Sequence, residues 1–246
     1  MLNLIKKAKL STILFTLSTF SAFTNASLIT NGSFEQLIFA DNSKSTGTVH
    51  KTNLLNFANK NRAWDVFYYL PGWETSYGNG IELQKNVVTR SQNGSHHVEL
   101  DSHPRGASNA VMTQTLDSLT IGANYLLEFY YKPRTNNTND NGINVFWYDS
   151  AIDFDLSMQA DFSTDSTHKL TPNWALQSVT FTAQTQSMDL SFGSFGKQNT
   201  LGGLIDNVSL NKVTSKPATA VPEPPMLILF VIALGLLVVR QRKWIH

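Results

Sequence analysis

Hydrophobic and polar residues alternate along short runs in the middle of the chain, and no stretch there has the spacing of a long amphipathic helix. Runs of this kind, rich in β-branched and aromatic residues, are typical of strands that bury one face. Gly, Asn, Asp and Ser separate most of them. The predicted strands are 80–84, 97–100, 110–116, 124–132, 142–148, 176–183, 187–192 and 203–210. Many short strands, each needing a second sheet to cover its apolar face, predict an all-β sandwich or jelly roll.

The start of the chain has the pattern of a secretory signal peptide. Lys6, Lys7 and Lys9 form a basic region, residues 10–23 form a short apolar run, and small residues precede a cleavage site after Ala26. An uncleaved anchor or an amphipathic helix is the alternative, but the apolar run is short for a membrane span. The pattern therefore predicts export and removal of the first 26 residues.

The end of the chain has three parts in a fixed order. Pro222, Glu223 and Pro224 precede an apolar run at 226–239, and a basic tail begins at Arg240. Positive charge after the run places the tail in the cytoplasm and the body outside. This order resembles the PEP-CTERM sorting signal of Gram-negative bacteria. The resemblance implies processing by an exosortase, with an inner-membrane intermediate before the cell envelope or the exterior; a permanent single-pass anchor is the alternative.

These ends divide the chain into four parts. We expect a signal peptide (1–26), a β-sandwich domain (27–211), a linker (212–220) and a sorting signal with a transmembrane helix (221–246). Before processing, the C-terminal helix would make the membrane a partner of the chain.

Composition excludes several classes of function. The chain has 246 residues, a net charge of +1 and no cysteine, which excludes disulfides, thiolate metal sites and a cysteine nucleophile. Both ends are basic, so the body carries a net charge of about −4. An acidic body argues against nucleic acid as a partner.

Three short motifs carry a second resemblance. They lie at 31–35 (NGSFE), 71–74 (PGWE) and 203–210 (GLIDNVSL), and in this order they resemble the galactose-binding-like jelly roll. That superfamily includes many carbohydrate-binding modules, and in it the first and last strands lie side by side. The resemblance therefore implies a galactose-binding-like jelly roll that binds polysaccharide.

The same resemblance implies a structural calcium ion. It makes Glu35 and Asp206 the candidate ligands, with Asn31 as a weaker one. Calcium takes several oxygen ligands, which carboxylates and carbonyl groups supply. The alternative is that the two acids make ordinary hydrogen bonds at the end of a strand and in a turn.

Aromatic residues gather in a region that also contains Gly, Pro and Asn. Flat rings pack against the C–H face of a sugar while polar neighbours bind its hydroxyl groups. The candidates for carbohydrate binding are Tyr68, Tyr69, Trp73 and Tyr77. A sandwich also buries tryptophan in its core, so for Trp73 a core position is the alternative.

The run 96–101 (HHVELD) combines histidines with carboxylates, so a metal site or acid–base catalysis is one interpretation. On a strand, His97, Glu99 and Asp101 would share one face. No recognisable zinc-hydrolase motif or nucleophile elbow accompanies them, and spacing alone does not pair two carboxylates for glycoside hydrolysis. Five aspartates between 149 and 165 lack the order of an EF-hand and indicate a solvated loop.

The sequence therefore favours an exported, non-catalytic protein that binds carbohydrate such as the exopolysaccharide of a matrix. A structural or adhesive matrix protein that contacts other proteins is the second interpretation. A glycan hydrolase or lyase is the third.

Overall fold

A computed structural model describes residues 26–38, 57, 59–103, 108–137, 139–165 and 173–214. The predicted signal peptide up to residue 25 and the predicted sorting signal with Pro222, Glu223 and Pro224 lie outside these residues. Within the part of the chain that is described, no helix is both long and apolar enough to span a membrane.

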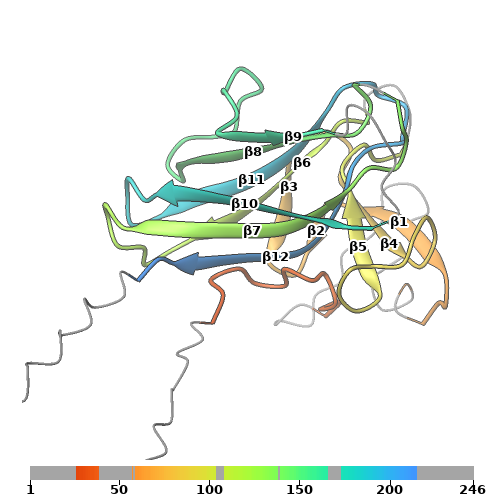
Figure 1. The fold of residues 1–246 in the computed structure, drawn as a ribbon, viewed down its shortest axis with the longest axis horizontal. Helices are drawn as coiled ribbons and strands as arrows, with labels where there is room; N and C mark the ends of the chain where they lie inside the picture. The colour runs from red at the N-terminus through yellow and green to blue at the C-terminus, as the bar shows by residue number, and fades with distance from the viewer. Residues whose placement is uncertain are drawn as a thin grey trace, which may run out of the picture.

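Two antiparallel six-stranded sheets make up the fold (Figure 1). The first sheet contains, in spatial order, β1 (Ala63–Phe67), β4 (Ile81–Lys85), β5 (His96–Glu99), β12 (Leu204–Lys212), β7 (Asn124–Lys132) and β10 (Ala175–Thr182). The second contains β2 (Tyr69–Leu70), β3 (Trp73–Tyr77), β6 (Val111–Leu116), β11 (Met188–Phe195), β8 (Gly142–Asp149) and β9 (Phe162–Thr164). The expected all-β sandwich is confirmed.

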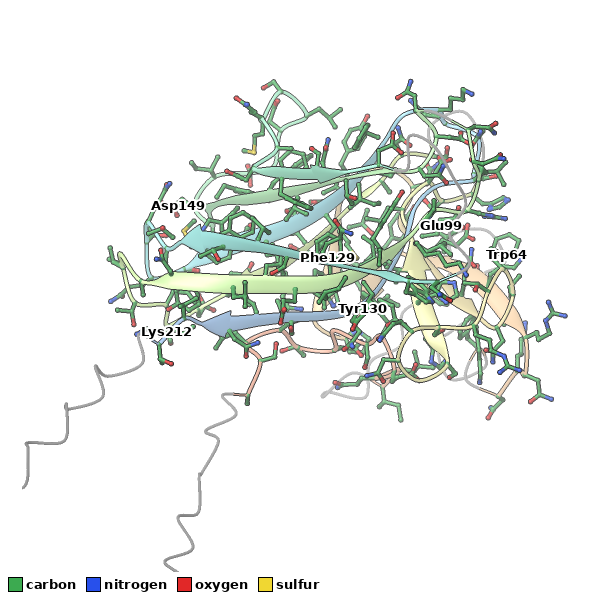
Figure 2. The ribbon with its side chains drawn as sticks, viewed as in Figure 1. Trp64, Glu99, Phe129, Tyr130, Asp149 and Lys212 are labelled. Atoms are coloured by element: carbon green, nitrogen blue, oxygen red, sulfur yellow. The ribbon has the colours of Figure 1, made fainter. Side chains whose placement is uncertain are left out.

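Alternation along the strands places the core between the sheets. In β7, Leu127 and Phe129 are fully buried while Glu128 between them is half-buried. Phe129, labelled in Figure 2, meets Phe192 of β11 edge to face, with ring centroids 5.1 Å apart. Burying a side chain of this size stabilises the fold by about 2–3 kcal/mol.

The beginning of the described chain lies along its last strand, as the resemblance implies, but it is not itself a strand. The Leu28 amide donates to the Leu210 carbonyl over 2.9 Å, and the Val208 amide donates to the Gly32 carbonyl over 2.8 Å. A Cβ atom at Gly32 would stand 1.9 Å from the Val208 carbonyl oxygen, so only glycine fits this approach. The red-orange segment beside the blue β12 in Figure 1 shows this closure.

Candidate functional site

The candidate site is the face of the second sheet that points away from the first sheet, called here the outer face. On β11, Leu190 and Phe192 pack in the core, so Ser191 between them points to the outer face. On β6, Met112 packs in the core and Thr113 beside it points outward. Ser191 and Thr113 are partners in the β6–β11 register.

A chain of hydroxyl groups, the hydroxyl ladder, crosses four strands of this face. Ser76 Oγ lies 2.7 Å from Thr113 Oγ1, Thr113 Oγ1 lies 2.6 Å from Ser191 Oγ, and Ser191 Oγ lies 2.9 Å from Tyr148 Oη. Thr113 and Ser191 are buried, whereas Ser76 is exposed and Tyr148 is half-buried. The ladder therefore fixes the hydroxyl groups at its two ends, and each can donate or accept a hydrogen bond.

The phenol at one end of the ladder stays neutral. Burial raises the pKa of Tyr148, and the charges of Asp189 and Glu74 raise it further. Hydrogen bonds with Ser191 and Thr113 act in the opposite direction but do not cancel the rise.

Two hollows lie next to each other on the outer face. The first has a volume of about 310 Å³; Val111 and Phe146 line it on the sheet, and Phe154 and Leu156 of the β8–β9 connection line its side. The rings of Phe146 and Phe154 meet edge to face at 5.1 Å. An apolar wall beside polar strands is typical of a small-molecule or saccharide site.

The second hollow has a volume of about 270 Å³ and continues along β6. Thr113 and Thr115, the next outward-pointing residues after Val111, line it together with Glu74. The outward positions from 111 to 115 extend the two hollows over a strand length of about 14 Å. This shape suits an extended ligand better than a single compact one.

Three of the four predicted sugar-binding aromatics, Tyr69, Trp73 and Tyr77, line the hollows. Tyr77 is 45% exposed and lines the first hollow, and Tyr69 is 55% exposed and lines the second. Tyr68 is 51% exposed but lines neither hollow.

The Trp73 side chain is only 2% exposed although it lines the second hollow, which agrees with the alternative of a core position. Its ring packs against Phe34 and Phe192 at centroid distances of 6.0 Å, and its indole N–H donates to the Asn31 carbonyl. It belongs to the floor under the second hollow.

Sequence reasoning missed the residues of the β8–β9 connection. Ile152, Phe154, Leu156 and Met158 alternate with polar residues there, and three of the four line the first hollow. The aspartates in this connection indicated a solvated loop. The apolar residues that alternate with them were the signal for a wall that lines a hollow.

Glu35 and Asp206, the predicted calcium ligands, are brought to the same segment, residues 91–96 before and at the start of β5. Glu35 Oε1 accepts the amides of Ser95 and His96 over 2.6 and 2.7 Å. Asp206 Oδ2 accepts the amides of Gln92 and Asn93 over 2.7 and 2.9 Å. The two acids thus fasten a loop from both sides.

Asn31 lies elsewhere in the loop network. Its amide nitrogen donates to the carbonyls of Gln36 and Pro71, and its oxygen accepts the Gln36 amide. Its side-chain oxygen is therefore already a hydrogen-bond acceptor within its own turn.

The pKa values of the two carboxyl groups are shifted in opposite directions. Burial raises the pKa of Asp206 to about 7, against the hydrogen bonds from Asn93, Asn207 and Gln92. Burial also acts to raise the pKa of Glu35, but hydrogen bonds from Ser95 and His96 outweigh it and lower that pKa.

This donor set does not fit a calcium shell. Calcium needs six to eight oxygen ligands, whereas the oxygens of Glu35 and Asp206 face N–H and O–H donors. Among the residues that the structure describes, no group of three or more His, Asp or Glu side chains could hold a metal ion. These hydrogen bonds argue against calcium at Glu35 and Asp206, and the resemblance remains the one ground for expecting it there.

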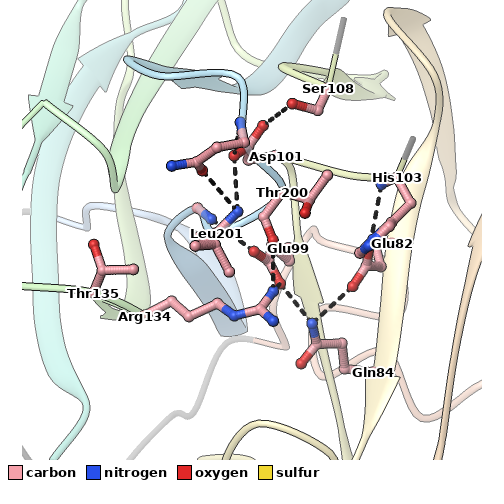
Figure 3. Close-up of polar contacts among 12 residues, drawn as sticks. Glu82, Gln84, Glu99, Asp101, His103, Ser108, Arg134, Thr135, Thr200 and Leu201 are labelled. Atoms are coloured by element: carbon pink, nitrogen blue, oxygen red, sulfur yellow. Dashed lines mark hydrogen bonds and ion pairs between the residues drawn. The ribbon is translucent and has the colours of Figure 1, made fainter. Parts of the chain in front are cut away.

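His97, Glu99 and Asp101 are all buried, and Glu99 and Asp101 lie in one cluster of polar side chains (Figure 3). Glu99 Oε2 accepts from Arg134 over 2.6 Å and from Gln84 over 2.5 Å, and Glu99 Oε1 accepts the Gly202 amide over 2.7 Å. The cluster lies at the end of the molecule where Glu99 and Trp64 are labelled in Figure 2.

Burial is the largest cause of the pKa shifts of Glu99 and His97. Burial raises the pKa of Glu99 well above its ordinary value and the nearby charge of Glu82 adds to the rise, while Arg134 opposes it. Burial lowers the pKa of His97 to about 3, so its ring is neutral at pH 7. With each carboxylate held by internal donors, the arrangement serves as a structural network of the first sheet.

Comparison with known proteins gives one family. The family model described as "Protein of unknown function (DUF642)" matches residues 27–211. A "Multifunctional-autoprocessing repeats-in-toxin" of Vibrio vulnificus is 27% identical over 154 residues, which are 62% of this chain. The aligned residues make up only 3% of the toxin's length.

Solved structures with a similar architecture include carbohydrate-binding modules. TmCBM61, described in complex with beta-1,4-galactotriose, is 13% identical with a TM-score of 0.40, covering 77% of this chain and all of that one. A structure described as "CBM4 structure and function" is 17% identical with a TM-score of 0.34, covering 75% of this chain and 99% of that one.

Proposed function

We propose a function for this chain, which belongs to the DUF642 family of proteins of unknown function: it is an exported, non-catalytic protein that binds polysaccharide on the outer face of its second sheet. The observation that carries the proposal is the pair of adjoining hollows on that face. Exposed Tyr69 and Tyr77 line one hollow each, and fixed hydroxyl groups lie between them.

This combination matches the two surfaces of a sugar ring. The C–H groups of a pyranose pack against aromatic and apolar side chains, while its hydroxyl groups need donors and acceptors at the edge. Tyr77 and Phe154 supply the first kind of surface, and the hydroxyl ladder, which reaches the second hollow at Thr113, supplies the second. The elongated shape of the two hollows favours a polymer over a monosaccharide.

The positions of the carboxylates support a non-catalytic role. Glycoside hydrolysis needs two carboxyl groups that flank the scissile bond in reach of substrate. Glu82, Glu99 and Asp101 are each no more than 1% exposed, and their oxygens are occupied by internal donors. Glu74, by contrast, is an exposed carboxylate that lines the second hollow.

The ends of the chain complete the proposal. The signal peptide and the sorting signal predicted from the sequence would deliver the domain to the envelope or the exterior, with an exosortase as the processing enzyme and polysaccharide of the matrix as the ligand. The acidic body and the lack of cysteine are compatible with such a place.

The test is affinity electrophoresis against a panel of soluble polysaccharides, followed by calorimetry on each binder. We expect Tyr69→Ala and Tyr77→Ala each to weaken binding about three- to tenfold, because each removes one stacking surface. Tyr68→Ala is the matched control, since Tyr68 is equally exposed but lines neither hollow.

Two results would count against the proposal. If no polysaccharide retards the protein, carbohydrate binding is wrong, and the adhesive role becomes the better interpretation. If Tyr68→Ala weakens binding as much as the other two substitutions, the ligand binds elsewhere on the surface.

A further inference from the structure

We propose that the outer face selects uncharged polysaccharides and discriminates against polymers that carry carboxylate or sulfate groups. The inference rests on the proposed function and names the ligand class for the same site. It comes from the way in which charge is divided between the two sheets.

None of the six strands of the second sheet contains a Lys, Arg or His residue. The three residues with acidic or basic side chains in these strands, apart from tyrosine, are all acids: Glu74, Asp149 and Asp189. The strands of the first sheet carry all the basic residues found in strands, namely Lys85, His96, His97, Lys132 and Lys212. An anionic polymer on the outer face would therefore meet no cation from the sheet beneath it.

The walls of the hollows repeat this division. Among the residues that the structure describes, their polar lining consists of amides and hydroxyl groups, such as Asn109, Asn144 and Thr115, with Glu74 as the only acid and with no Lys, Arg or His. Recognition of carboxylate or sulfate groups in proteins relies on Arg, Lys or clustered N–H groups. Lys197 is exposed on the rim, between two lining residues, and is the basic residue nearest to the hollows along the chain.

Negative charges on this face already repel one another. The pKa of Asp189 is raised, first by burial and then by the charges of Asp117 and Asp149. Asp189 and Glu74 in turn raise the pKa of Tyr148. A further carboxylate from a ligand would add to this repulsion and lose its hydration without a counter-ion from the strands of this sheet.

Neutral sugar hydroxyl groups avoid that cost. Each hydroxyl donates one hydrogen bond and accepts two, and so do the side chains of Ser76 and Tyr148 at the ends of the hydroxyl ladder. Glu74 can accept a hydrogen bond from a sugar hydroxyl, as carboxylates in such sites do. The face is thus suited to hydroxyl groups and unsuited to anions.

The experiment compares polymers that differ only in charge. Soluble galactan, glucan and mannan are oxidised at C6 to uronates, and half of each product is converted to its methyl ester. The ester keeps the C6 carbonyl group but removes the charge. We expect the protein to bind at least one neutral polymer, to bind its ester within about threefold, and to bind the free acid at least tenfold more weakly.

A variant ties the discrimination to this face. Glu74→Lys places a cation in the second hollow and is expected to recover most of the lost affinity for the free acid. Leu176→Lys is the matched control: it adds the same charge at an exposed position on β10 of the first sheet and is expected to recover none. Circular dichroism and thermal unfolding confirm that both variants fold.

The outcomes separate the two proposals. Binding of the free acid as tight as that of the ester overturns the charge selectivity and leaves carbohydrate binding intact. Equal recovery by Leu176→Lys shows that total charge, and not this face, decides the selectivity. Lack of binding to every polymer overturns carbohydrate binding itself.

Discussion

Arg134 is the cation that accompanies the Glu99 carboxylate into the interior. Its guanidinium donates to Glu99 and, over 2.9 Å, to the Thr200 carbonyl. Glu82 lies close enough to raise the Glu99 pKa by its charge. Removing the guanidinium would leave two buried carboxylates side by side with one partner fewer, and this is more costly than losing an exposed ion pair.

We therefore expect Arg134→Ala to lower the free energy of unfolding by about 3 kcal/mol at neutral pH. Urea unfolding measures this loss. At acidic pH the loss should shrink, because Glu99, whose pKa is already raised, takes up a proton once its partner is gone. Arg90→Ala is the control, since its exposed position predicts a change below about 0.5 kcal/mol. Equal losses in the two variants would contradict a special role for Arg134.

Among the elements, the segment 91–96 is held by acids from two distant parts of the chain. Glu35 comes from the N-terminal segment and Asp206 from β12. Gly94 has a φ of +66°, and a Cβ atom there would stand 2.3 Å from Glu35 Oε1, so a side chain at this position would displace the carboxylate. The segment is thus built around the two acids.

Asp206 makes the stability of this element depend on pH. Its pKa of about 7 in the folded protein lies above its ordinary value of 3.8, so the folded state holds an extra proton between about pH 4 and 7. The free energy of unfolding then falls as pH rises through that interval. His97, with its pKa lowered to about 3, contributes the opposite slope below about pH 6.5, and a comparison with a variant at Asp206 cancels that contribution.

We expect Asp206→Asn to gain about 3 kcal/mol in free energy of unfolding relative to the unsubstituted protein between pH 4 and pH 8. The measurement is the difference between the two proteins in urea unfolding at each pH. Any constant effect of the amide disappears in this comparison. A difference that does not change with pH would show that Asp206 stays ionised in the folded protein.

The elements that the sequence predicted best are those with one face in the core and one in partial contact with solvent. The predicted strand 124–132 coincides with β7, and 187–192 falls on most of β11. β1 was not predicted from the sequence. Asp65 is buried along with its apolar neighbours, so the alternation of buried and exposed residues that marks a strand is absent. β2 and β3 are short and joined by a tight turn. Their sequence was interpreted as a region of aromatic residues with Gly, Pro and Asn, without strands.

The candidate site was predictable only in part, for a physical reason. A sequence shows which tyrosines lie near turn residues, where exposure is common, and Tyr69 and Tyr77 do line the hollows. The hydroxyl ladder joins positions 76, 113, 148 and 191 on four strands, so it depends on the register of three strand pairs. For Trp73 the sequence left a binding role and a core position open, because a tryptophan beside a turn can face either side, and here it packs on Phe192.

Across the whole molecule, the two sheets differ in the features that they carry. The first sheet joins the ends of the described chain, since β12 pairs with β7 and takes up the N-terminal segment, and it also holds the buried network of Glu99 and Arg134. The second sheet leaves its outer face open and free of basic strand residues. The closure of the chain and the buried polar network therefore lie in one layer, and the proposed binding surface lies in the other.

This division bears on the calcium predicted from the resemblance, since a structural ion would stabilise the whole domain and not one loop alone. A ligand that binds only the folded state adds about 2.7 kcal/mol when its concentration is a hundred times its Kd, which would raise Tm by about 5 °C or more in a domain of this size. The oxygens of Glu35 and Asp206 already accept backbone N–H groups, which do for the segment 91–96 what an ion would do. We expect Tm to change by less than about 1 °C between calcium and EGTA, measured by calorimetry. A fall of about 5 °C in EGTA that is absent in Asp206→Asn would instead establish calcium at this position and show that the N–H donors leave room for it.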